Sequence, residues 1–402
     1  MLFFNFSLTS SARIWTNTEG KEIEADYVKN TELEVTLRMA GGKIYQIPLS
    51  KLSEADIEFV RSGEAKFSES PDENAEGEME EKGGDVESLN WTDEWPASVK
   101  FEEKAQISVD SEDAEKGVFI YSSQNYRFTS DVRLSKSVVD SFVDLFEATR
   151  VYCRTLPLAV DGGEKHDGKY DILLFETKEA YVKAGGPPSS AGVFISGKNI
   201  VMVPLSGLGV QKVGSGYMRD RDKSNKTLPH ELTHQLTPAP YYRKGMMGWF
   251  TEGLAEYIGV TPYRSGRFNV RSNLDDIAAY ASAYGKDDGG GRAMGEEFRA
   301  PHLADFMMMP YSEFAGENGN FNYGFGLLIT TYFFHFDGDG DAALIKKALQ
   351  KVRESPRDTD PQEYIDILLN GRSFEKLQED IYKAWRSKGI KINFSPRNQD
   401  TE

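Results

Sequence analysis

The sequence predicts an α+β protein, and three observations support this fold class. Short runs of alternating apolar and polar residues, separated by turn residues, fill the region from 12 to 63. Further strand-like runs follow between residues 96 and 204, whereas apolar residues at helical spacing dominate after residue 275. Strands that come first and helices that come later favour an α+β arrangement over alternating βαβ units.

The composition favours a globular chain with more than one domain. The chain has 402 residues, which is enough for a large domain and an accessory module. Its formal net charge is -17 and no block is rich in lysine and arginine, so we expect that nucleic acid is not a partner. No run approaches the roughly 20 apolar residues that cross a bilayer, and we therefore expect no transmembrane segment.

The first domain is predicted at residues 12–63. Turn signals at 17–20, 29–30 and 41–42 separate its short strands, a pattern that predicts a small β-barrel. Ser53 is expected to cap a short helix over residues 54–61 that closes this domain.

Part of this domain resembles a known family. The words Arg13-Ile-Trp-Thr16 and Ile47-Pro-Leu-Ser-Lys-Leu-Ser53, with Gly20 between them, are similar to the first Sla homology domain. That family is an SH3-like barrel often attached to other domains in bacterial proteins. The resemblance implies a short-peptide partner for the barrel, but it identifies no binding residue.

An acidic linker is predicted at residues 64–95. From Glu64 to Asn90 the chain holds ten acidic residues against two lysines, with few apolar residues. Such a segment cannot bury enough apolar surface to fold, so we expect it to be solvated and to separate two domains.

The first residues suggest export. Met1-Leu-Phe-Phe-Asn-Phe6 followed by Ser10-Ser-Ala12 resembles the end of a signal peptide, although a basic start is missing. We expect a periplasmic or secreted protein whose signal peptide is incomplete in this reading frame. An ordinary chain terminus and a cytoplasmic location are the alternative.

A larger domain is predicted at residues 96–395, with a mixed sheet and a mainly helical C-terminal half. The strand-like runs lie at 98–101, 118–121, 170–175 and 200–203. One amphipathic helix is indicated by apolar residues at helical spacing, which are Val138, Val139, Phe142, Leu145 and Phe146.

His230-Glu-Leu-Thr-His234 is an HExxH motif, which has chemical meaning only in a helix. Thr227 can cap such a helix, Pro229 suits its first turn, and Pro238 ends it. A spacing of four places both imidazoles on one face, where they can share one zinc ion.

A second helix-like segment supplies acidic residues. This segment is Gly248-Trp-Phe-Thr-Glu-Gly-Leu-Ala-Glu-Tyr257, in which Glu252 follows His234 after 17 intervening residues and Glu256 lies one turn further on. Two histidines and one glutamate are a known ligand set for catalytic zinc, which leaves a fourth position for water. A surface helix decorated with these residues is the alternative to a metal site.

These paired motifs resemble the gluzincins, zinc peptidases with a zincin-like domain that include aminopeptidase-N-like enzymes. The resemblance implies that His230, His234 and Glu252 bind one Zn²⁺, and that Glu256 hydrogen-bonds a ligand histidine. It further implies hydrolysis of a peptide or protein substrate. Glu231 is the expected general base, which takes a proton from a zinc-bound water and returns it to the leaving amine.

The oxyanion donor in the aminopeptidase-N type is a tyrosine in a Tyr-x-x-Gly pattern. Tyr323-Gly-Phe-Gly326, at the start of an apolar helix, matches this pattern. We therefore expect Tyr323 to be catalytic, with Tyr311 and Tyr332 as competitors.

Substrate binding is predicted in residues 191–204, which indicate two strands around a turn at Gly197-Lys198. An edge strand here can pair with extended substrate, and we assign substrate contacts to Phe194, Ile200 and Met202. A core hairpin is the alternative. The Gly-x-Met-Glu-Asn motif with which aminopeptidases hold a substrate amino terminus is not recognisable, which favours an endopeptidase.

Two other functions stay open. The chain can be an inactive peptidase-fold scaffold that recognises partners through its N-terminal barrel. Zinc can also activate water against a carbonyl that is not a peptide. His302, His335 and Cys153 lie in apolar surroundings and are expected to be packed in the core rather than to bind metal.

Overall fold

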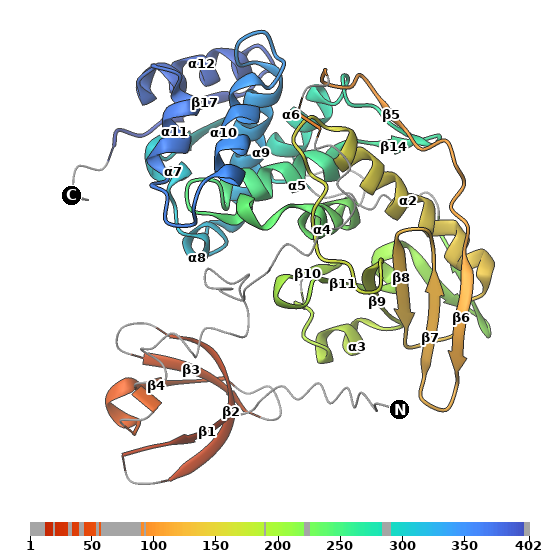
Figure 1. The fold of residues 1–402 in the computed structure, drawn as a ribbon. Coiled ribbons are helices and arrows are strands. Elements are labelled where there is room, and N and C mark those ends of the chain that lie inside the picture. Colours follow the sequence, from red (N-terminus) through yellow and green to blue (C-terminus); the bar gives the residue numbers. More distant parts are fainter. Residues whose placement is uncertain are drawn as a thin grey trace. The chain divides into compact units, whose positions relative to one another are not determined.

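The computed structural model describes two compact units, which divide between residues 79 and 80 (Figure 1). The described residues are 13–18, 21–30, 34–39, 44–53, 56–57, 90–91, 94–188, 190–220, 226–283 and 291–397. The signal-like residues 1–12 and most of the acidic segment 64–95 lie outside this range.

The small unit is an antiparallel sheet whose strands follow chain order. They are β1 (Arg13–Thr16), β2 (Glu22–Asn30), β3 (Glu34–Met39) and β4 (Ile44–Pro48), followed by the 3₁₀ turn η1 (Leu49–Lys51). Apolar residues that alternate along these strands form its core, which contains Trp15, Ala25, Val35, Leu37, Leu49 and Leu52. The predicted strands are therefore present.

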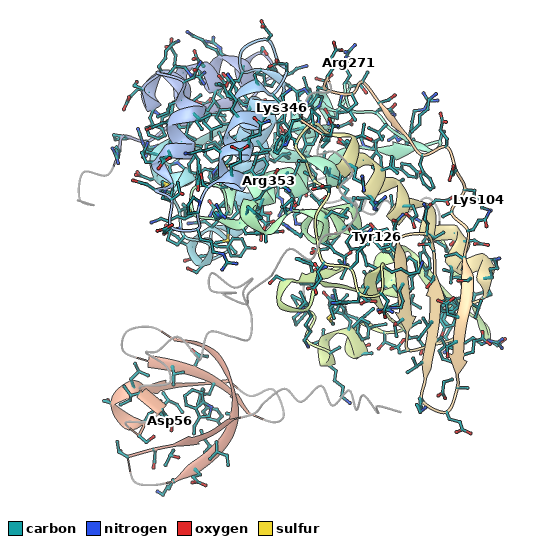
Figure 2. The ribbon with its side chains drawn as sticks, in the orientation of Figure 1. Asp56, Lys104, Tyr126, Arg271, Lys346 and Arg353 are labelled. Atoms are coloured by element: carbon teal, nitrogen blue, oxygen red, sulfur yellow. The ribbon has the colours of Figure 1, made fainter. Side chains whose placement is uncertain are left out.

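The predicted closed barrel is not formed by the described residues. β1 and β4 each pair only with their inner neighbour, so the sheet stays open. The two edges meet at a single bridge between Asn17 and Leu52. Next to this bridge the Asp56 carboxylate accepts the Thr16 N–H at 2.7 Å (Figure 2). Ser53 Oγ accepts the Asp56 N–H at 3.2 Å, as expected of the predicted cap, whereas all of the predicted helix 54–61 except residues 56 and 57 lies outside the described residues.

The larger unit is built on a mixed six-stranded sheet of order β10-β11-β9-β8-β7-β6. β8 and β9, and β9 and β11, are parallel pairs, whereas the other neighbours are antiparallel. β10 is therefore an edge strand. The strands are β6 (Ser108–Asp113), β7 (Val118–Ser122), β8 (Tyr126–Ser130), β9 (Tyr170–Phe175), β10 (Val193–Ile195) and β11 (Ile200–Pro204).

Helix α2 (Lys136–Thr155) packs across this sheet and joins it to the helical half. Ser135 caps it by accepting the Val138 N–H, and the predicted apolar stripe is buried. Phe146 lies edge-on to Tyr126, which is labelled in Figure 2, and to Phe128, with ring centroids 5.6 and 4.9 Å away. Buried aromatic pairs of this kind contribute about 0.5–1.5 kcal/mol each beyond their buried area.

Most of the remaining chain is helical, as predicted for the C-terminal half (Figure 1). α5 packs against α4 on one side and α9 on another. The helices are α3 (Lys178–Lys183), α4 (Thr227–Leu236), α5 (Trp249–Val260), α6 (Leu274–Ser282), α7 (Leu303–Met307), α8 (Tyr311–Phe314), α9 (Gly319–His335), α10 (Ala343–Glu354), α11 (Gln362–Leu369) and α12 (Phe374–Arg386).

Small sheets complete the larger unit. They comprise a hairpin of β12 (Val210–Val213) and β13 (Gly216–Arg219), a sheet of β5 (Val99–Lys100), β14 (Tyr263–Arg264) and β15 (Arg267–Phe268), and the parallel pair β16 (Glu297–Ala300) and β17 (Lys391–Phe394). Trp91 and Trp95 pack against the hydrophobic core of the larger unit, so this unit begins before residue 96. Among the described residues no helix is long and apolar enough to span a membrane.

Candidate metal centre

Helix α4 carries the HExxH motif. It begins at Thr227, so Lys226 rather than Thr227 occupies the cap position, and it ends before Thr237 and Pro238 as predicted. Its buried leucines face the core and leave the two histidines on the side toward α5. On the back of α4, the buried thiol of Cys153 contacts Thr233 Oγ1 at 3.9 Å, and burial raises the pKa of this thiol to about 12. Cys153 is therefore a core residue.

Helix α5 lies close to both α4 and α9 because a glycine of α5 faces each of these helices. A Cβ on Gly259 would lie 2.7 Å from the Lys226 carbonyl oxygen of α4. A Cβ on Gly253 would lie 2.5 Å from the Gly326 carbonyl oxygen of α9. Larger residues would push the helices apart. The spacing that these glycines allow brings Glu252 to the two histidines.

Three ligand atoms converge between α4 and α5. His230 Nε2 lies 3.1 Å from His234 Nε2, and Glu252 Oε2 lies 3.1 Å from His234 Nε2 and 3.3 Å from His230 Nε2. With zinc–ligand bonds of about 2.1 Å, tetrahedral ligands lie roughly 3.4 Å apart. The triangle therefore fits one face of a zinc coordination shell. In the part of the chain that the structure describes, these three residues form the group of histidine and acidic side chains that could hold a metal ion.

Glu256 supports His230 from behind. Its Oε1 lies 2.9 Å from His230 Nδ1, and its two oxygens accept hydrogen bonds from Arg292 Nη2 at 2.6 Å and Nε at 3.0 Å. A proton on Nδ1 leaves Nε2 free as a ligand. Burial opposes the charge of Glu256, but His230 and Arg292 outweigh it and lower its pKa to about 2. Burial likewise opposes protonation of His230, yet Glu252 and Glu256 raise its pKa to about 10.

Tyrosines support the other two ligands. The Tyr242 hydroxyl lies 3.3 Å from His234 Nδ1 and donates to the His234 carbonyl oxygen at 3.1 Å. The Tyr311 hydroxyl donates to Glu252 Oε1 at 2.8 Å, which leaves Oε2 for the metal. Neither Tyr242 nor Arg292 belongs to a sequence motif, so the sequence does not predict their contacts with the site. The sequence predicts Tyr311 only as an alternative oxyanion donor.

Glu231 lies between the metal ligands and the edge strand. Its Oε2 accepts the Phe194 N–H at 2.8 Å, and a Cβ on Gly192 would lie 3.6 Å from its Cγ. Burial raises the pKa of the Glu231 carboxyl, while the neighbouring histidines oppose this shift. A carboxylate held in this way is suited to accept a proton from a water molecule at the metal.

Tyr323 reaches the same site from α9. Its hydroxyl lies 3.4 Å from the Tyr311 hydroxyl, and its ring centroid lies 6.2 Å from that of His230. The single Tyr311 proton is committed to Glu252, so Tyr323 is the donor in the contact between the two hydroxyls. Burial raises the pKa of Tyr323, which keeps the phenol protonated. The competitor Tyr332 donates to Asp337 at 3.2 Å instead.

The predicted hairpin is present, but it divides the predicted substrate residues. Phe194 lies on the edge strand β10, with its ring centroid 6.5 Å from that of His234. Ile200 and Met202 lie on β11, which is paired on both sides by β10 and β9. Their backbone groups cannot pair with a substrate strand. The predicted pairing with an extended substrate is therefore possible along β10 and excluded along β11.

The remaining histidines considered in the sequence are packed, as predicted. His335 Nε2 lies 2.8 Å from the Tyr257 hydroxyl and its ring lies edge-on to Trp95. Burial lowers the pKa of His335 to about 4. His302 is buried and its Nδ1 accepts the Ala304 N–H at the start of α7.

A known family matches the small unit. Residues 6–67 match the family model of SLA1 homology domain 1, in agreement with the similarity noted in the sequence. No curated protein matches the chain.

Proposed function

We propose that the larger unit is a zinc-dependent hydrolase that cleaves peptide bonds, acting as an endopeptidase of the gluzincin type on a zincin-like domain. The observation that carries this proposal is the triangle of His230, His234 and Glu252 with Glu231 beside it. Each ligand is also oriented by a hydrogen-bond partner, an arrangement typical of metal sites rather than of a decorated helix surface.

The ion would be held by His230 Nε2, His234 Nε2 and Glu252 Oε2. The chemistry that zinc supplies when bound is acidification of a water molecule and polarisation of a substrate carbonyl. The two imidazoles and one carboxylate leave one position for that water, as in catalytic rather than structural zinc sites.

Side chains and backbone of the protein would carry out the proton transfers and hold the substrate. Glu231 accepts the water proton and later delivers it to the leaving amine, so it acts first as base and then as acid. Tyr323 donates a hydrogen bond from its phenol, which stays protonated, to the oxygen that becomes negative in the tetrahedral intermediate. The open edge of β10 pairs with the extended substrate, which places the scissile carbonyl next to Glu231.

Metal stoichiometry is the first test of this proposal. Mass spectrometry of the full chain should find about one zinc ion per molecule, absent from a His230→Ala, His234→Ala double variant and present in a His335→Gln control. No bound zinc after reconstitution would contradict the proposal.

Glu231→Gln then separates an enzyme from an inactive scaffold. This variant should retain zinc but lose about 10²–10⁴-fold in the cleavage rate of a peptide library, because only the proton acceptor is removed. Equal cleavage in the variant would exclude Glu231 as the base. Zinc binding without any cleavage by the wild-type chain would favour the scaffold.

The small unit is proposed to recruit a protein partner. Its match to SLA1 homology domain 1 supports a role in protein interaction and fits the short peptide expected from the sequence. This role is tested on an isolated fragment of residues 12–63. Fluorescence anisotropy measures the binding of peptides to this fragment and to its Trp15→Ala variant. Equal binding by both chains would contradict a folded binding surface.

A further inference from the structure

Arg292 lies behind the metal ligands and contacts two parts of the site at once. Its guanidinium makes two hydrogen bonds to the carboxylate of Glu256, from Nη2 at 2.6 Å and from Nε at 3.0 Å. Glu256 is buried and its Oε1 also lies 2.9 Å from His230 Nδ1. The orientation of His230 therefore depends on a carboxylate that Arg292 holds in place.

The same guanidinium is also attached to α9. Its central carbon lies 5.0 Å from the ring centroid of Tyr323. Asn320, one turn earlier, donates to the Arg292 carbonyl oxygen at 2.7 Å and accepts from Arg292 Nη1 at 3.2 Å. Gly324 leaves room for this contact, because a Cβ there would lie 2.9 Å from Arg292 Cβ.

We propose that Arg292 is a positioning residue that sets both the metal ligand His230, through Glu256, and the phenol of Tyr323. This inference rests on the proposed function and deepens it. Only arginine offers both features, since a lysine ammonium can pair with one carboxylate oxygen but has neither the planar fork nor the face that lies against a tyrosine ring.

Two separate consequences follow from this double contact. Loss of the fork lets Glu256 and then His230 move, which weakens zinc binding. Loss of the planar face lets Tyr323 shift, which lowers kcat even when zinc is saturating. A residue that acted only on folding would alter neither quantity in a folded chain.

The test compares Arg292→Lys with Arg299→Lys in the full chain. Arg299 is an exposed arginine on β16, so its variant is a matched control of equal chemistry. Zinc affinity is measured by competition with a chromogenic chelator. We expect Arg292→Lys to weaken zinc binding about tenfold and Arg299→Lys to leave it unchanged. At saturating zinc, kcat for peptide cleavage should fall about tenfold in Arg292→Lys with KM unchanged within about twofold.

Double variants show whether Arg292 acts through the proposed contacts. In a Glu256→Gln background, Arg292→Lys should weaken zinc binding no further. In a Tyr323→Phe background, it should cause no further loss of kcat at saturating zinc. Circular dichroism and thermal unfolding select the variants that remain folded, and Asn320→Ala, which loosens Arg292 from α9 without removing it, serves as a milder second variant.

The outcomes separate this inference from the proposed function. A wild-type chain without zinc overturns both. A wild-type chain that binds zinc, with Arg292→Lys and Asn320→Ala of wild-type zinc affinity, overturns the role of Arg292 and leaves the metal centre intact. Additive losses in the double variants would also overturn it, because Arg292 would then act by another route.

Discussion

Helix α5 has buried histidines on two of its sides, and the two environments are opposite in chemistry. Toward α4, His230 meets the carboxylates of Glu252 and Glu256 within 3.3 Å. Toward α9, His335 lies against Tyr257, the residue that follows Glu256, and against the rings of Trp95 and Phe334. The pKa of His230 is raised to about 10, whereas that of His335 is lowered to about 4.

The difference shows what distinguishes a candidate metal ligand from a packed histidine in this fold. Both rings are largely removed from water, and burial alone disfavours the imidazolium at both positions. The carboxylates reverse this effect at His230 because they supply negative charge in a place of low polarity. The same negative charge attracts a divalent cation. The neighbouring carboxylates, rather than the histidine itself, therefore distinguish the candidate metal site.

The largest expected effect is the loss of zinc when a histidine of the candidate metal centre is replaced. Alanine at His230 or at His234 should each reduce bound zinc to background, because two ligands cannot replace three. His335→Gln should leave zinc stoichiometry at the wild-type value. Mass spectrometry of the three purified variants measures this, and retention of zinc by either alanine variant would contradict the ligand assignment.

The next effect compares two adjacent residues of α5. Glu256→Gln should weaken zinc binding about 10–100-fold, because the amide cannot hold the Nδ1 proton of His230 as a carboxylate does. Tyr257→Phe, which removes hydrogen bonds to His335 and Trp95 but none to a candidate metal ligand, should leave zinc affinity unchanged. Chelator competition on both chains gives the values, and equal zinc affinities would mean that the two sides of α5 are not distinct.

A pH effect is expected from His335. Its folded pKa of about 4 lies below the unfolded value of 6.5, so the unfolded chain binds the extra proton between these pH values. The free energy of unfolding should therefore fall as the pH drops from 7 to 5, by about 2 kcal/mol from this residue. Urea unfolding in chelator at both pH values, with His335→Gln as the comparison, measures it. The variant should lose less stability than the wild type, and parallel losses would refute this origin.

The smallest effect is expected from Tyr242, which contacts the candidate ligand His234. Tyr242 faces His234 with a neutral hydroxyl at 3.3 Å, whereas Glu256 faces His230 with a carboxylate at 2.9 Å. Tyr242→Phe should therefore weaken zinc binding only about two- to fivefold, less than Glu256→Gln, since neutral hydrogen bonds are about half as strong as charged ones. The same chelator assay ranks the two variants, and a larger loss in Tyr242→Phe would reverse the proposed order of support.

Much of the scaffold could be predicted because it depends on local pattern. The apolar runs of β9 and β11, the apolar stripe of α2 and the proline that follows α4 each act within a few residues. The barrel could not be predicted in the same way. Closure requires β1 and β4 to pair, and that pairing depends on sheet twist and on contacts between distant residues rather than on alternation.

The candidate site divides along the same line. The sequence by itself determined which side chains are candidate metal ligands, because HExxH and the glutamate of α5 are fixed by helical spacing and by ligand chemistry. Only the tertiary structure decided that Glu252 meets both histidines, that β10 rather than β11 has the open edge, and that Tyr242, Tyr311 and Arg292 contact His234, Glu252 and Glu256. These contacts join α4, α5 and α9, and their geometry depends on how closely the glycines at 253, 259 and 326 allow the helices to pack.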